Sequence, residues 1–261
     1  MTLRALRRAV ALVFALTACI FAYWRLRVRG RITLVDRAQW LHGAACRVLR
    51  AMGINCDVQG QAPSHGLVVS NHLSYLDIVI LSAIMPCFFV SKIEVNRWPY
   101  FGEAARVGGT IFIDRTSRAS TAEVAGEIAE RLKLPIPVLL FPEGTSSDGA
   151  QVLRFHSSLF EPAVTGGAPV TAASVRYVFE NGNEERDLCW FDDTLFLPHL
   201  WKTLGAAGFR AEVRFGEPRL YPDRRTAARA THEEVAAMRA GKQVLTDSRT
   251  SSALQSYPSM P

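Results

Sequence analysis

From Gly66 onward, the chain alternates short apolar runs with stretches whose apolar residues recur at helical spacing. Helices are predicted after Arg115, where Ser120 and Glu123 have capping-box spacing, and over two further ranges, 76–84 and about 226–240. The apolar runs predict strands over 67–70, 87–91, 110–114, 136–141, 169–179 and 211–216. Because such strands are apolar on both sides, the sheet needs helices on both faces. The pattern therefore predicts an α/β domain over residues 57–240.

Two further helices are predicted before this domain, within residues 1–56. Between Arg8 and Arg25 lie sixteen uncharged residues, mostly apolar, which as a helix cover about 24 Å of a hydrocarbon core about 30 Å thick. The segment 36–53 carries apolar residues at helical spacing, with Gly53 as its predicted end. One apolar and one amphipathic helix in succession predict a membrane-docking hairpin.

Arginines dominate the charge of this N-terminal region. They lie on both sides of the apolar run, and residues 1–31 contain no acidic residue: Arg4, Arg7, Arg8, Arg25, Arg27, Arg29 and Arg31. Arginines bind anionic lipid headgroups, and Tyr23 and Trp24 are typical of a membrane interface. We therefore expect the run to enter one leaflet or to lie in the interface, although its length comes close to a span. A cleaved signal peptide and a buried core helix remain alternatives.

Composition and charge narrow the class of protein. With 49% hydrophobic and 21% charged residues the chain is globular. The net charge of +6 belongs to the N-terminus, because without those seven arginines 23 basic residues face 24 acidic ones. This distribution excludes a nucleic-acid partner. The five cysteines form no CxxC pair, which favours a reducing compartment. The Ser/Thr-rich tail, 241–261, is expected to be disordered.

The densest cluster of chemically active residues is Ser70 to Asp77, between a predicted strand and a predicted helix. Ser74 and Asp77 have the spacing of a capping box. His72 precedes the helix, so a turn can bring its imidazole over the first helical turn. Asp77 would then accept a hydrogen bond from Nδ1–H, which leaves Nε2 free to act as a base. A capping box beside an incidental histidine is the alternative.

Two other clusters also follow predicted strands. The turn from Phe141 to Gly149 contains Gly144, which permits the backbone angles of an anion-binding concavity. Glu143 in that turn would repel an anion unless it faces a hydroxyl or a basic residue. The strand 110–114 ends just before Arg115, whose guanidinium suits a phosphate. Taken singly, each cluster also has an ordinary interpretation: the residues 141–149 as a plain turn, and Arg115 as part of a solvated ion pair.

Taken together, the three clusters are more specific. The order NHxSxxD, a strand ending in DR, and FPEGT, behind a membrane hairpin, resembles the glycerolipid acyltransferases typified by 1-acylglycerol-3-phosphate acyltransferase. The resemblance runs from about Gly66 to Gly216, plus the helix pair. It implies that His72 and Asp77 are catalytic and that Arg115 contacts the acceptor's phosphate. The other implied substrate-binding residues are Asn71, Ser74, Glu143, Gly144 and Thr145.

The resemblance also implies a reaction. His72 takes the proton of a lysolipid hydroxyl, which attacks the thioester of acyl-CoA or acyl carrier protein without a covalent intermediate, a metal or a cofactor. The implied product is phosphatidate, made from 1-acylglycerol-3-phosphate on the cytoplasmic face of the inner membrane. Two departures, Ala172 for a proline and the run from Phe155 to Ser158, leave another lysolipid such as lyso-ornithine lipid as an alternative acceptor.

Two other classes of function compete. A thioester or lipid hydrolase would use Ser70 or Ser74 as nucleophile, although the chain has no GxSxG motif. A non-catalytic lipid-binding protein would bind a lysolipid without turnover. Of the remaining histidines, His156 is of interest because it follows the FPEGT turn.

Overall fold

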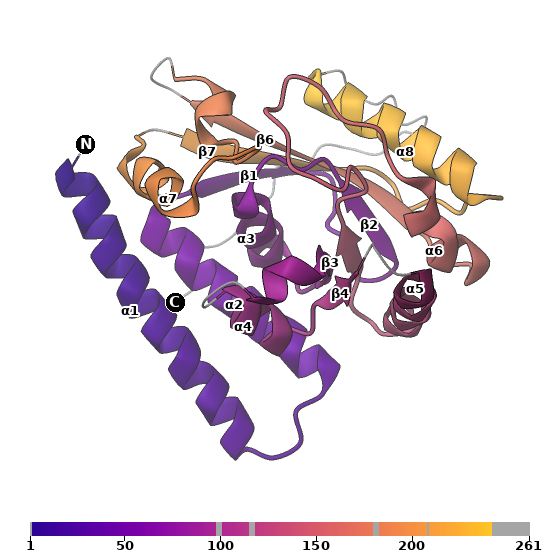
Figure 1. Cartoon of the computed structure of the whole chain (residues 1–261), viewed down its shortest axis with the longest axis horizontal. Coiled ribbons are helices and arrows are strands. Elements are labelled where there is room, and N and C mark those ends of the chain that lie inside the picture. The colour runs from indigo at the N-terminus through magenta and orange to yellow at the C-terminus, as the bar shows by residue number, and fades with distance from the viewer. Residues whose placement is uncertain (1, 98–100, 115–117, 180–182, 208, 242–261) are drawn as a thin grey trace.

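A computed structural model describes residues 2–97, 101–114, 118–179, 183–207 and 209–241. Within this part of the chain, one seven-stranded sheet has the order β1-β7-β6-β2-β5-β3-β4 (Figure 1). Its strands are β1 (Asn55–Gln59), β2 (Leu67–Ser70), β3 (Phe88–Lys92), β4 (Ile111–Ile113), β5 (Val138–Leu140), β6 (Val170–Phe179) and β7 (Phe209–Phe215). The predicted strands are confirmed, and β1 is an addition to them.

The strand directions bring the predicted clusters to one edge of the sheet. β2 pairs in parallel with both β5 and β6, and β3 pairs in parallel with β5 and β4. The antiparallel partner of β6 is β7. The carboxyl ends of β2, β5 and β4 therefore share one edge, which is where α/β proteins build their sites.

Eight α-helices and three 3₁₀-helices accompany the sheet in the described residues. The α-helices are α1 (Thr2–Val28), α2 (Leu34–Met52), α3 (Tyr75–Ile84), α4 (Phe101–Val107), α5 (Arg118–Leu132), α6 (Glu161–Thr165), α7 (Phe196–Gly205) and α8 (Arg224–Arg239). The 3₁₀-helices are η1 (Ile93–Arg97), η2 (Ser157–Phe160) and η3 (Glu185–Leu188).

Alternate residues of the central strands enter two separate apolar cores. Val68 and Leu139 pack in the core that contains α3 and the end of α2. Leu67 and Val138 pack on the other face, in the core that contains residues of α5 and α8. The prediction of a sheet covered by helices on both faces is confirmed.

The N-terminal helices form the predicted hairpin, with α1 lying along the outside of α2 (Figure 1). Thr33 and Asp36 cap the start of α2, and Gly53 ends it with a φ of 66°. Arg8 fastens α1 to the body, since its guanidinium donates to the carbonyl oxygens of Leu204 (3.2 Å) and Ala206 (2.6 Å) at the end of α7.

The first helix is longer than its apolar core. It has 27 residues, or about 40 Å, because the flanking arginines are good helix formers and extend it at both ends. By length and composition, Leu3–Val28 is apolar enough to cross a membrane. Only 6% of its most apolar window is buried, so the alternative of a buried core helix is wrong.

Several local expectations need correction. α5 already contains Ser120, because the described helix begins at Arg118, so the capping box predicted there does not start it. β1 begins at Asn55 and pairs with β7, so the expected boundary at 56/57 falls inside a strand. The tail residues 242–261 lie outside the described residues.

Candidate active site

The loop between β2 and α3 folds as its capping box predicts. Ser74 is the N-cap of α3, and Asp77 accepts the backbone N–H of Ser74 at 3.0 Å through Oδ2. The same oxygen lies 2.9 Å from Nδ1 of His72. Asp77 is fully buried, whereas 19% of the His72 side chain is exposed. The structure therefore places the two predicted catalytic side chains in contact and leaves the imidazole accessible.

Tyr177 completes this chain of hydrogen bonds from the far side. It lies on β6, is buried, and donates its hydroxyl hydrogen to Oδ1 of Asp77. Burial, and then the charge of Asp77, raise the pKa of Tyr177 well above its usual value, so the phenol stays a neutral donor. Tyr177 was missed in the sequence, where it is one aromatic residue in an apolar strand.

Phe141 fixes the plane of the imidazole. Its ring stacks on His72 with centroids 4.0 Å apart and an interplanar angle of 13°. With one face of the ring covered and Nδ1 bonded to Asp77, Nε2 is the nitrogen available for proton transfer. These contacts suit the imidazole to accept a proton at Nε2.

Glu143 joins the FPEGT turn to the histidine loop. Its Oε1 accepts the backbone N–H of His72 at 3.0 Å, and its Oε2 accepts that of Leu153 at 3.2 Å. Burial raises the pKa of Glu143 to about 7. Ser147 adds a further tie, since its backbone N–H donates to the carbonyl oxygen of His72 at 3.0 Å. Glu143 thus acts here as a clamp on the loop that carries His72.

The other predicted substrate-binding residues occupy different environments. Asn71 is buried, and its amide exchanges two hydrogen bonds with the backbone of Val175, at 3.0 and 2.9 Å. Gly144 adopts a left-handed φ of 77°, as expected for this turn. Thr145 beside it is exposed. Arg115 lies outside the described residues. Asn71 therefore supports the loop from beneath, and Thr145 lies at the surface.

Neither serine proposed as a hydrolase nucleophile is placed for that role. Ser70 and Ser74 are both fully buried. The hydroxyl of Ser74 accepts the backbone N–H of Leu76, and that of Ser70 has no hydrogen-bond partner among the described residues. A nucleophile must lie within hydrogen-bond reach of its base, and in the described structure neither hydroxyl bonds to His72.

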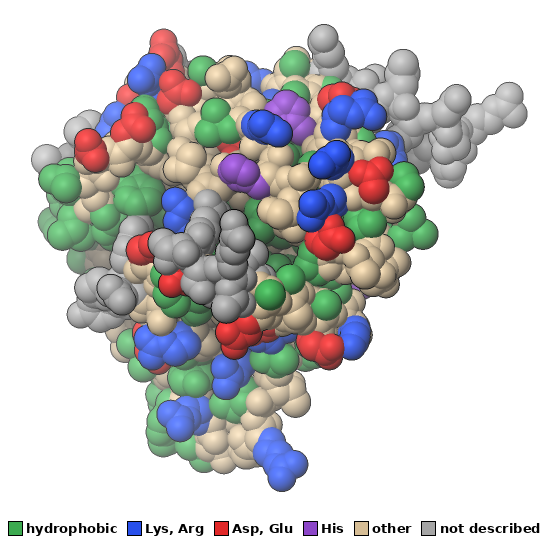
Figure 2. Space-filling view, turned by 45° about the vertical axis from the view of Figure 1, so that its right-hand side comes forward, with side chains coloured by type: hydrophobic (Ala, Val, Ile, Leu, Met, Phe, Trp, Pro, Cys, Tyr) green, Lys and Arg blue, Asp and Glu red, His purple; other side chains and the backbone are tan. Residues whose placement is uncertain are grey.

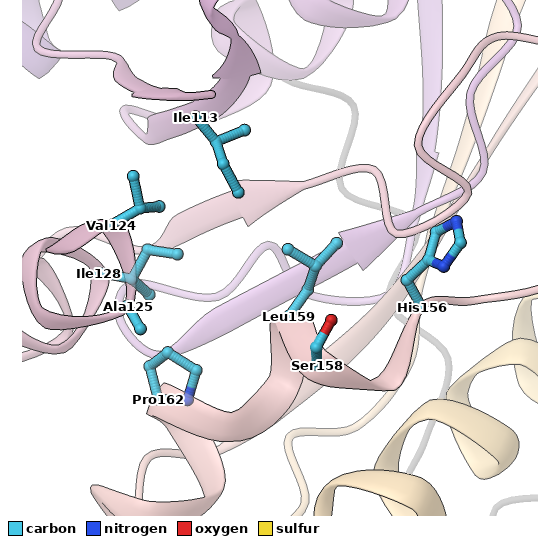
Figure 3. A pocket seen from close by; sticks show the side chains of 8 residues that line it. All are labelled: Ile113, Val124, Ala125, Ile128, His156, Ser158, Leu159 and Pro162. Carbon is cyan, nitrogen blue, oxygen red and sulfur yellow. The ribbon is translucent and has the colours of Figure 1, made fainter. Parts of the chain in front are cut away.

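An apolar cavity of about 250 Å³ lies beside the FPEGT turn (Figure 3). Its lining residues come from β4, α5 and the segment 156–162: Ile113, Val124, Ala125, Ile128, His156, Ser158, Leu159 and Pro162. His156 links the cavity to the turn, because its backbone N–H donates to the carbonyl oxygen of Pro142 at 2.9 Å. Aliphatic side chains converge in the view, with His156 at the end away from α5.

Comparison with known proteins identifies the family of this chain. A family model described as "Acyltransferase" matches residues 54–176. A lyso-ornithine lipid O-acyltransferase of Rhodobacter capsulatus is 38% identical over 206 residues, which cover 75% of this chain and 73% of that protein. The chain belongs to the acyltransferase family.

Two other proteins are also similar to this acyltransferase. A 1-acyl-sn-glycerol-3-phosphate acyltransferase of Neisseria meningitidis serogroup B is 38% identical over 138 residues, covering 52% of this chain and 54% of that one. The crystal structure of PlsC, the 1-acyl-sn-glycerophosphate acyltransferase of Thermotoga maritima, matches with a TM-score of 0.68 at 19% identity. It covers 95% of this chain and 98% of its own, so the fold is shared along nearly the whole length.

Proposed function

We propose that the acyltransferase moves a fatty acyl group from the thioester of acyl-CoA or acyl carrier protein to the free hydroxyl of a lysolipid. The observation that carries this proposal is the chain Tyr177–Asp77–His72, which ends on an accessible imidazole nitrogen. The relatives named as lyso-ornithine lipid and 1-acyl-sn-glycerol-3-phosphate acyltransferases support a lysolipid acceptor.

In the proposed reaction, Nε2 of His72 accepts the proton of the lysolipid hydroxyl as that oxygen attacks the thioester carbonyl carbon. The new C–O bond gives a tetrahedral intermediate, whose collapse breaks the C–S bond. The imidazolium then returns its proton to the departing thiolate. Asp77 stabilises the imidazolium, and a general base of this kind contributes about 10²–10⁴-fold to the rate.

Direct transfer, without an acyl-enzyme, is the route that the described contacts favour. An acyl-serine intermediate needs an accessible hydroxyl beside the base, whereas Ser70 and Ser74 are fully buried and differently bonded. The acceptor hydroxyl itself then takes the place that a serine occupies in hydrolases.

Two acceptors stand out, and both carry a free hydroxyl. The motifs favour 1-acylglycerol-3-phosphate, whose product is phosphatidate. The greater coverage of the lyso-ornithine relative, together with His156 and Ser157 after Phe155, supports lyso-ornithine lipid as the second candidate. We further propose that the apolar cavity beside the FPEGT turn holds part of an acyl chain, because its walls are mostly aliphatic.

The proposed location is the cytoplasmic face of the inner membrane, where thioester donors are available. α1 supports membrane attachment, since large apolar side chains such as Phe14 (71% exposed) and Ile20 (67% exposed) face outward. A helix with such a surface buries it in lipid.

The direct test uses the full chain purified in detergent. Each acceptor, 1-acylglycerol-3-phosphate and lyso-ornithine lipid, is combined with each donor, acyl-CoA and acyl carrier protein, and both free thiol and acylated lipid are measured. Transfer gives equal amounts of the two products. Thiol release without acylated lipid would assign a hydrolase, and lysolipid binding without either product would assign a lipid-binding protein.

A further inference from the structure

A second cavity, of about 430 Å³, lies on the other side of the segment that separates the FPEGT turn from α6. Its lining residues come from that segment and from α8: Arg154, Phe155, Ser157, Arg225, Ala228, Arg229 and His232. We call it the basic cavity. On the face turned toward the viewer in Figure 2, Lys and Arg side chains gather near histidine side chains in the upper part of the view.

The basic cavity concentrates positive charge, although the carboxylate of Asp223, outside its lining, interacts electrostatically with Arg225. Arg154 and Arg225 are exposed, and neither guanidinium has an ion pair or hydrogen bond within the described part of the chain. Arg229 lies 3.4 Å from Glu233, and no Asp or Glu is among the described residues that line the cavity. Positions 32–261 carry one more acidic than basic residue, so this concentration is local. Guanidinium groups so placed suit a phosphate.

The basic cavity is connected to the active site through the Glu143 clamp. Leu153, the residue before Arg154, donates its backbone N–H to Oε2 of Glu143, whose Oε1 holds the backbone N–H of His72. On the other side, Nε2 of His232 lies 3.2 Å from the carbonyl oxygen of Val152, which ties α8 to the same segment. Residues 152–154 therefore join the basic cavity to the loop that carries His72.

The basic cavity also lies away from the membrane helix. In Figure 1, α8 and α1 are on opposite sides of the sheet. With α1 in lipid, α8 faces water. An anionic group that reaches this cavity therefore belongs to a water-soluble substrate and not to the headgroup of a lipid in the bilayer.

We propose that the basic cavity binds the phosphate at the end of the donor's phosphopantetheine arm, a group that acyl-CoA and acyl carrier protein share. Arg154 and Arg225 hold the phosphate, and the arm runs past Leu153 so that the thioester reaches His72. This inference rests on the proposed function, in which the donor is such a thioester.

The test compares Arg154→Ala/Arg225→Ala with wild type, using acyl-CoA, acyl carrier protein and acyl-pantetheine, which lacks the phosphate. We expect KM for the two phosphorylated donors to rise about tenfold, as loss of charge-assisted phosphate contacts predicts. KM for acyl-pantetheine and for the lysolipid stays unchanged, and kcat at saturation stays within about twofold. Arg224→Ala is the matched control, because this neighbour pairs with Glu161 and lies outside the basic cavity.

Three kinetic outcomes would overturn the inference. The first is an unchanged KM for the phosphorylated donors. The second is an equal rise for acyl-pantetheine, which would mean a general disturbance of the site. The third is a rise for the lysolipid, or for only one phosphorylated donor, since the phosphate common to both donors would then not be the ligand.

Calorimetric binding of CoA, which needs no turnover, separates this inference from the proposed function. We expect the double variant to bind CoA about tenfold more weakly than wild type and Arg224→Ala to bind it normally. Arginine-dependent CoA binding by a chain that transfers no acyl group would retain the cavity and overturn the proposed function. If the chain transfers acyl groups but both variants bind CoA as tightly as wild type does, the proposed function stands and the inference about the basic cavity is wrong. Arg225→Gln alone, at an exposed position, provides a milder variant with a smaller expected effect.

Discussion

The hydroxyl of Tyr177 donates to Oδ1 of Asp77 while the opposite carboxylate oxygen faces Nδ1 of His72. One buried carboxylate thus joins β6 to the loop after β2, across 100 positions of sequence. Since a hydrogen bond to Asp77 spreads its charge, Tyr177 tunes how strongly the carboxylate attracts the proton on the imidazole. In the proposed mechanism it is a positioning residue for the base.

Replacing Tyr177 by Phe tests this role. We expect kcat/KM to fall at least about tenfold, since a hydrogen bond to a charged group contributes about 1.5–3 kcal/mol. We expect the loss to fall on kcat and to leave KM for the lysolipid unchanged, because the hydroxyl contacts Asp77 on the side away from the imidazole. Tyr75→Phe is the matched control, because this phenol is also buried but lies 3.1 Å from Nδ1 of His199. Equal losses in the two variants, or a change confined to KM, would mean that Tyr177 contributes only to packing.

Glu143 gives a pH dependence of stability. Its pKa of about 7, raised from 4.5 by burial, means that between these values the native state keeps a proton that the unfolded state has lost. Stability from this group therefore falls as pH rises through that window, with a slope of at most about 1.4 kcal/mol per pH unit. Glu143→Gln removes the titration, so its stability relative to wild type improves from pH 5 to pH 8.

Urea unfolding of both proteins at the two pH values measures this change. Glu233→Gln, at an exposed position beside Arg229, is the control and keeps a constant difference from wild type. If the free energy of unfolding of Glu143→Gln instead falls relative to wild type as pH rises, the native state stabilises the charged form of the carboxylate.

The apolar cavity predicts chain-length selectivity. Ala125 lines it from α5, so Ala125→Phe fills part of its volume of about 250 Å³. We expect kcat/KM for long acyl chains to fall about tenfold relative to short ones. This is the effect of excluding about two methylenes from the cavity, since each buried methylene contributes about 0.8 kcal/mol. Ala122→Phe introduces the same ring at an exposed position of the same helix and serves as control. An equal effect on all chain lengths would remove the acyl chain from this cavity.

The outer surface of α1 predicts how the protein attaches to lipid. Phe14→Glu places a charge where a large side chain is 71% exposed, so partition into anionic vesicles falls while the fold persists. Leu220→Glu makes the same change at a site 69% exposed between β7 and α8. Flotation with vesicles compares them, and equal binding by both variants would contradict attachment through α1.

Local sequence was sufficient where short-range chemistry fixes the backbone. The contact between His72 and Asp77 follows from the capping box of Ser74 and Asp77, which is four residues long. The cap of α2 by Thr33 and Asp36 is of the same kind but was missed, because the helix was predicted only from residue 36. Tyr177 was beyond reach, because its place depends on the pairing of β6 with β2, in which Ser70 lies opposite Ala173.

The elements that were missed carry weak local patterns. β1 alternates partly buried and exposed residues, including Asp57, and is stabilised by pairing with β7. α7 is short and contains Pro198, and its buried side packs under α1 and beside Tyr75. Ser120 is the opposite case: its local pattern is that of a helix cap, but α5 already begins at Arg118, so Ser120 lies inside the helix.

In the proposed mechanism, the imidazole of His72 removes the proton from the hydroxyl of the acceptor. The most direct measurement is single-turnover acyl transfer by His72→Ala, with lysolipid binding and thermal unfolding recorded on the same sample. We expect the rate to fall at least about 100-fold, with lysolipid binding and the fold preserved. A variant that keeps a tenth of the wild-type rate or more would contradict it.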